Sequence, residues 1–188
     1  MAPRRRRAAL LALMVSIVAG ACGSTAPSGS GAPTVPPVEA SIAAPTPLQS
    51  LTTQLSGAAA ALRGALEPEG FRLELVNRAF RTSEPPELSA APRAVFQIDV
   101  GDPNAGYVTV YEFPDAASAA TAGAALGRHL GSGFGQTNYA LDAQFWVSQV
   151  GGTIIFTWWS CERSDDPART ERAFNLVSSV GQPIPVAR

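Results

Sequence analysis

Few residues in this sequence could carry out chemistry. Cys22 and Cys161 are the only cysteines, His129 is the only histidine, and lysine is absent. Cys161 and His129 could form a cysteine–histidine nucleophile pair, but the local sequence indicates no third residue to orient the histidine. His129 also has no neighbour at a metal-ligand spacing. We therefore expect a protein that is not an enzyme and holds no metal or cofactor.

Two short patterns imitate ligand sites. Asp99, Asp102 and Asn104 lack the 1-3-5 spacing, the glycine and the closing glutamate of a calcium loop, so they indicate a hairpin turn. The glycines at 131, 133 and 135 follow an expected helix and precede an expected strand. That is the reverse of the order in a dinucleotide-binding loop, and the pattern favours a connector.

The N-terminus has the order of a signal peptide. Four arginines at positions 4–7 precede an apolar run over 8–21 that is too short to span a bilayer. Residues 1–21 are therefore expected to be removed on export. The sequence leaves open whether export follows the general or the twin-arginine route.

The cleavage site is Ala19-Gly20-Ala21-Cys22, which resembles the lipobox of bacterial lipoproteins. The resemblance implies that Cys22 is acylated and becomes the first residue of the mature chain. Lipoboxes usually have leucine where this chain has Ala19, so the site also fits A-x-A cleavage of a secreted, unlipidated protein. If Cys22 carries lipid through its sulfur, Cys161 is left as a buried thiol or forms an intermolecular bridge.

Composition divides the exported chain into two parts. Residues 22–47 consist mostly of Pro, Ser, Gly, Thr and Ala, which predicts a disordered tether behind the anchor. Residues 48–188 are long enough for one domain with its own core. Removal of residues 1–21 takes four of the 14 arginines and none of the 15 acidic residues, which leaves a net charge of about −5. This charge excludes nucleic acid as a partner.

Periodicity predicts an α+β domain. Its five strands should form a mostly antiparallel sheet with about three helices packed on one face. The expected order is helix, three strands, helix, two strands, helix. The helices are expected at 47–66, 115–130 and 166–181, and the strands at 71–75, 93–100, 106–112, 139–150 and 153–160.

Alternation along the strands places several aromatic residues on the sheet face that the helices leave open. Tyr107, Tyr111, Trp146 and Trp159 are expected there among polar neighbours. Such a face could bind a protein partner, a second copy of the chain, or an apolar or sugar ligand. Alternatively, a loop such as 82–92 covers the face, and these aromatic side chains belong to the core.

One further resemblance concerns the whole chain. The stretch from Val108 to Ala119, with Cys22 and its tether upstream, resembles small uncharacterised envelope lipoproteins of GC-rich bacteria. It implies a lipid anchor on the extracytoplasmic side of the cell membrane and an α+β domain, and it carries over no functional residue except Cys22. A binding domain is the first interpretation, and an enzyme with a loop-assembled site is the second. The third is an assembly protein dimerised through Cys161.

Overall fold

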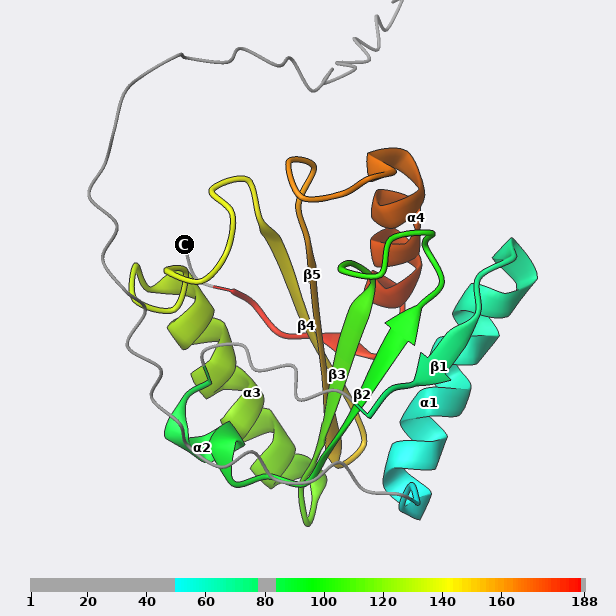
Figure 1. The fold of residues 1–188 in the computed structure, drawn as a ribbon. Coiled ribbons are helices and arrows are strands. Elements are labelled where there is room, and N and C mark those ends of the chain that lie inside the picture. The colour runs from blue at the N-terminus through cyan, green and yellow to red at the C-terminus, as the bar shows by residue number, and fades with distance from the viewer. Residues whose placement is uncertain (1–49, 78–83, 187–188) are drawn as a thin grey trace, which may run out of the picture. The chain divides into compact units, whose positions relative to one another are not determined.

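The computed structural model describes residues 50–77 and 84–186 (Figure 1). All of them belong to one compact unit. The expectations for residues 1–47, including the signal peptide, Cys22 and the tether, lie outside the described residues. Within the described ranges, no helix combines the length and apolar character needed to cross a membrane.

The described chain contains four α-helices, one 3₁₀ turn and six strands. The helical elements are α1 (Thr53–Leu66), η1 (Glu67–Glu69), α2 (Pro86–Ser89), α3 (Ala116–Gly131) and α4 (Pro167–Ser178). The strands are β1 (Leu73–Leu75), β2 (Arg93–Ile98), β3 (Tyr107–Glu112), β4 (Gln144–Val150), β5 (Thr153–Trp159) and β6 (Gln182–Pro183).

The strands form a single sheet in the order β1-β2-β3-β5-β4-β6, with every neighbouring pair antiparallel. Because β5 is antiparallel to both β3 and β4, these two strands run parallel to each other on either side of it. The antiparallel α+β expectation is confirmed. The expected strand count of five is wrong, because the two-residue β6 pairs with β4 and is too short to produce an alternating pattern.

Side-chain caps begin three of the helices. Thr52 accepts a hydrogen bond from the Leu55 N–H at the start of α1, and Asp115 accepts one from Ser118 at the start of α3. Asp166 caps α4 through the Arg169 N–H, with proline at the first helical position. Aspartate is favoured at such positions, because its carboxylate satisfies the free N–H groups of a first helical turn.

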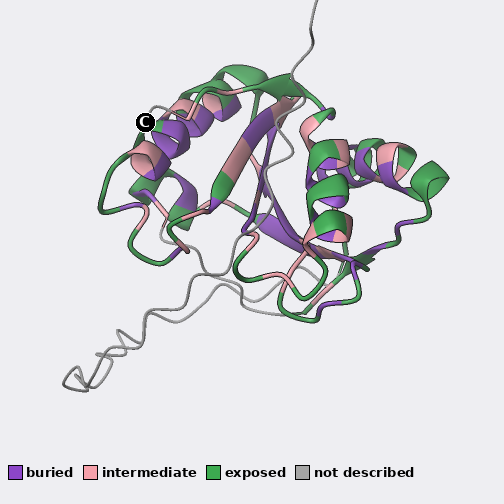
Figure 2. Cartoon of the chain, turned by 90° about the horizontal axis from the view of Figure 1, so that it is seen from above, coloured by how far each residue is buried: buried purple, intermediate pink, exposed green. Residues whose placement is uncertain are grey.

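Helices cover both faces of the sheet (Figure 1). Helices α1 and α4 pack on one face around Ile155, and α3 packs on the other around Ile154 and Phe156. The expectation of helices on one face is therefore wrong. Strand β5 is apolar at successive positions, so it has side chains to bury on both sides. Figure 2 shows buried residues between the layers and exposed residues on the outer sides of the helices.

Candidate functional site

The four aromatic residues predicted to form an open face lie on two different faces. Tyr111 is paired with Ile154, so it points to the α3 side, as does Tyr107 four residues earlier. Trp159 points to the opposite side, where its ring lies 6.3 Å from the Phe174 ring of α4. Trp146 shares that side, because its partner Thr157 lies two residues from Trp159 on β5.

Burial also contradicts the open face. Tyr107, Tyr111 and Trp159 have exposed fractions of 6%, 0% and 7%, and Trp146 is half-buried. The prediction of a shared, exposed aromatic face is wrong, because it assumed that one sheet face had no helices. The alternative, that the aromatic side chains belong to the core, fits three of them.

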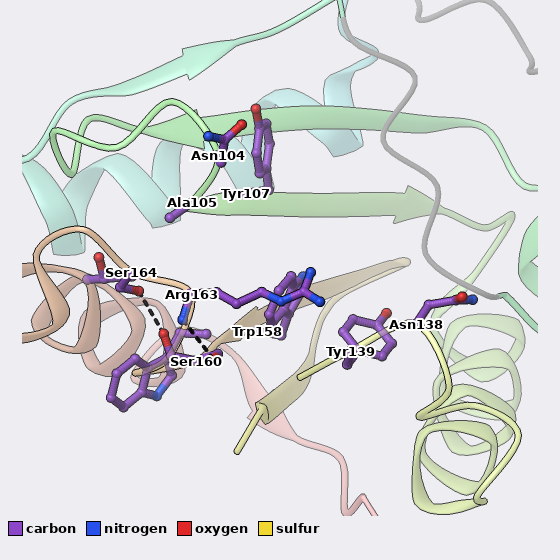
Figure 3. Close-up of a pocket in the computed structure, with 12 residues that line it drawn as sticks. Asn104, Ala105, Tyr107, Asn138, Tyr139, Trp158, Ser160, Arg163 and Ser164 are labelled. Carbon is purple, nitrogen blue, oxygen red and sulfur yellow. Dashed lines mark hydrogen bonds between the residues drawn. The ribbon is translucent and has the colours of Figure 1, made fainter. Parts of the chain in front are cut away.

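A pocket of about 240 Å³ opens at the end of the sheet where β3 begins and β5 ends. Three segments surround it in Figure 3: the loop before β3, the loop between α3 and β4, and the loop after β5. Its aromatic lining residues are Tyr107, Tyr139, Trp158 and Trp159. The volume is below the roughly 300–1,000 Å³ of pockets for drug-sized ligands, so the space suits a small molecule.

The aromatic wall is held together by ring contacts. Tyr139 meets the ring of Trp158 edge-on at 5.1 Å and that of Phe145 at 4.7 Å. On the facing side, the Tyr107 hydroxyl donates a 2.8 Å hydrogen bond to the Pro103 carbonyl. Edge-to-face pairs restrict ring rotation, so this wall is preformed.

Two aspartates join the three loops around the pocket. Asp102 is only 4% exposed, and its carboxylate accepts from the N–H of Asn104 at 2.7 Å and from the N–H of Asp165 at 3.4 Å. It therefore links the loop before β3 to the loop after β5. The expectation of a turn around Asp102 is confirmed, and its carboxylate makes the hydrogen bond of an Asx turn.

Asp142 makes the second link, from the loop between α3 and β4. It accepts a 2.5 Å hydrogen bond from Ser160 Oγ and a 3.1 Å bond from the N–H of Glu162. Burial opposes the charge, but the bonds from Ser160 and from the Glu162 and Cys161 N–H groups outweigh it and lower the pKa of Asp142. The carboxylate is thus matched to its donors in the ionised form.

The polar side chains at the pocket rim lack partners within the described chain. Asn104, Asn138 and Arg163 are exposed, and Arg163 forms no ion pair with any residue in the described ranges. In Figure 3 the Arg163 side chain extends across the pocket. The indole N–H of Trp159 is buried and donates to no atom of the described residues. None of the residues that line the pocket is acidic.

The two residues singled out for catalysis do not line this pocket. His129 lies in the last turn of α3, with its ring 6.0 Å from that of Phe134. Cys161 follows β5, is half-buried and is disulfide-bonded. A sulfur in a disulfide has no thiol to ionise, so Cys161 in this state is neither the buried thiol considered above nor a nucleophile. Over the described residues, no cluster of three or more His, Cys, Asp or Glu side chains could hold a metal ion.

Comparison with known proteins adds no family to this description. No protein-family model, curated protein or solved structure matches the chain. We therefore infer function from the residues of the site itself.

Sequence reasoning missed most of this site. Tyr139 and Trp158 were assigned to strands, and Asn138 and Arg163 fell in loops without a motif. The available signal was polar residues next to aromatic residues at three strand ends. That signal becomes meaningful only once β3 is known to pair with β5, because antiparallel pairing brings the start of one strand to the end of the other.

Proposed function

We propose that this chain is an exported bacterial lipoprotein, attached to the membrane through Cys22, whose domain binds a small molecule in the pocket at the end of the sheet where β3 begins and β5 ends. One observation carries the binding role. The pocket combines a fixed aromatic wall with exposed polar side chains that have no partner in the described chain. Largely apolar pockets with a few convergent polar groups are the usual form of small-molecule sites.

The hydroxyl groups of the pocket support binding rather than catalysis. Ser160 Oγ donates to Asp142 and accepts from the Arg163 N–H, so it serves to join two loops. Ser164 Oγ donates to the Ser160 carbonyl, and Thr170 Oγ1 donates to the Asp166 carbonyl. A nucleophilic hydroxyl needs a base that takes its proton, and these protons are directed at structural acceptors.

The anchor is proposed from the leader and the lipobox, and one observation favours a second candidate. Cys161 is disulfide-bonded, and Cys22 is the only other cysteine in the sequence. Lipid on the Cys22 sulfur is compatible with this bridge only if Cys161 pairs with a second chain, whereas an intrachain bridge between the two cysteines excludes the lipid. The second candidate is therefore a secreted domain, cleaved at the A-x-A site, whose two cysteines pair.

Intact-mass analysis of the mature protein from its native host tests the anchor. We expect a first residue at Cys22 with the added mass of acyl chains, and we expect Cys22→Ala to move the protein from the membrane to the soluble fraction. A mass that shows no lipid and two fewer hydrogens than the free dithiol would contradict the anchor and support the secreted form.

A fragment screen followed by NMR tests the binding role. Trp158 and Trp159 line the pocket and Trp146 does not, so three indole N–H signals provide a probe and an internal control in one chain. We expect fragments that bind to shift the signals of Trp158 and Trp159 and leave that of Trp146 in place. Shifts confined to Trp146, or no bound fragment at all, would contradict the proposal.

A further inference from the structure

We infer that the pocket selects a small carboxylate carried on a flat, unsaturated ring. This inference rests on the proposed binding role of the same pocket and adds the chemical class of the ligand. Three observations lead to it: the cation at the rim, the lack of acidic lining residues and the orientation of the aromatic wall.

The cation is Arg163. Four of the other six arginines among the described residues have partners. Arg72 pairs with Asp99 and Arg93 with Glu84. Arg169 donates to the Asp99 carbonyl, and Arg172 donates to the Glu69 carbonyl. Arg163 has no such partner there, and its side chain points across the pocket. A guanidinium presents two parallel N–H donors that match the two oxygens of a carboxylate.

The neighbouring polar groups favour an acceptor on the ligand. The side-chain amides of Asn104 and Asn138 can donate at the rim, and each also has an oxygen that accepts. The nearby carboxylate of Asp142 accepts hydrogen bonds from Ser160 and Glu162, and it forms no ion pair with Arg163 within the described residues.

The ring of the ligand is assigned to the space beside the aromatic wall. Trp158 is half-buried and Tyr139 holds it edge-on, so its orientation is fixed before binding. Figure 3 places Trp158 and Tyr139 on one side of the space and Tyr107 on another. A flat ring fits between such rings in stacked or edge-on contact, and the pocket volume of 240 Å³ limits it to a small molecule.

The test titrates the mature full-length protein with three probes. Benzoate has both the ring and the charge, benzyl alcohol has the ring alone, and acetate has the charge alone. We expect benzoate to bind at least about tenfold more tightly than either of the others, as a charge-assisted bidentate contact predicts. Its affinity should fall as salt concentration rises, whereas that of benzyl alcohol should not.

A matched pair of variants tests whether Arg163 supplies the positive charge that binds benzoate. Arg163→Gln should reduce benzoate affinity to about that of benzyl alcohol, roughly a tenfold loss, and leave benzyl alcohol binding unchanged. Arg128→Gln removes the same charge from an exposed position in the last turn of α3 and should leave both affinities unchanged. Thermal melting of both variants checks that they remain folded.

The possible results separate the two proposals. Equal binding of benzoate and benzyl alcohol at Trp158 and Trp159, or unchanged benzoate affinity in Arg163→Gln, would overturn the carboxylate inference and leave the binding role intact. If no probe and no fragment bound at these tryptophans, both proposals would be overturned.

Discussion

Single carboxylates hold this domain together at positions where loops meet. Asp102 and Asp142 each accept hydrogen bonds from a second segment, and each link crosses a long stretch of sequence. A third carboxylate, Glu84, is buried beside Arg93 and accepts a 2.8 Å hydrogen bond from the Tyr111 hydroxyl. Losing one partner from such a contact leaves the other partner unsatisfied, which makes these residues sensitive to small changes.

The contribution of Asp142 to the free energy of unfolding should depend on pH. Asp142→Ala removes the acceptor for Ser160 and Glu162, and we expect a loss of about 1 kcal/mol in the free energy of unfolding at pH 7. Because folding lowers the pKa of Asp142, the unfolded chain takes up this proton more readily. The contribution is therefore complete above the ordinary aspartate pKa of about 3.9 and is lost as the pH falls through the lower folded pKa.

Thermal melts of the wild-type and Asp142→Ala proteins between pH 3 and pH 7 measure this difference. Glu171→Gln, an exposed change on α4, is the control and should behave as wild type. A gap between wild type and Asp142→Ala that widens toward low pH would show that the link does not depend on the ionised carboxylate.

The buried pair of Glu84 and Arg93 should be costly to break. Their side chains are only 8% and 9% exposed. Glu84→Gln leaves the guanidinium of Arg93 buried without its counter-charge, and we expect a loss of about 3 kcal/mol in the free energy of unfolding. Chemical denaturation measures this loss. Glu87→Gln, an exposed change in the short helix α2 that follows Glu84, should cost less than about 0.5 kcal/mol. Equal losses in the two variants would contradict a role for the pair.

At the scale of elements, α3 is adapted to close packing. Most of its inward residues are small, and Gly123 and Gly127 face the C-terminal segment that contains Ile184 and Pro185. A Cβ at Gly127 would collide with the carbonyl oxygen of Pro185. Small residues on this helix therefore allow the backbone of the C-terminal segment to lie directly against it.

Two glycine substitutions distinguish the effect of close packing on stability from the effect of helix propensity. Gly127→Ala should lower the free energy of unfolding by about 1–3 kcal/mol, because backbone must move to admit the methyl group. Gly57→Ala on α1 meets no atom within 4 Å and should raise the free energy of unfolding by roughly 0.5–1 kcal/mol. Chemical denaturation of both variants gives the comparison, and stabilisation by both would show that α3 has room at this position.

At the scale of the whole molecule, the sheet is the middle of three layers. The two apolar clusters lie on opposite sheet faces, and aromatic residues of the strands contribute to both. This arrangement assigns Trp159 to the interior between β5 and α4, with its ring near Phe174. A residue there supports the domain as well as lining the pocket.

Trp159→Ala should therefore destabilise the protein rather than only weaken binding. With 7% of the residue exposed, we expect a loss of about 3–5 kcal/mol in the free energy of unfolding. Phe134→Ala is the matched aromatic control, because Phe134 is 77% exposed, and it should cost less than about 1 kcal/mol. A melting temperature for Trp159→Ala close to that of wild type would contradict the two-sided core.

The local sequence determined the elements of this domain more fully than their arrangement. The aspartate caps at 115 and 166, the glycine turn at 151–152 and the helical stripe of α1 all depend on neighbouring residues, and the structure contains each of them. The α+β class followed from their order. The short α2 and β6 were missed because four and two residues carry too little periodicity to detect.

Tertiary structure alone decided which faces are covered and where the pocket lies. The alternation of side chains along a strand predicts that Ile154 and Ile155 point to opposite sheet faces. It does not predict which helix packs against each of them. The site likewise joins Asn104, Tyr139 and Arg163, which come from three separate loops. Their meeting depends on the pairing of β3 with β5 and on the links at Asp102 and Asp142, and these contacts between distant residues leave no local pattern in the sequence.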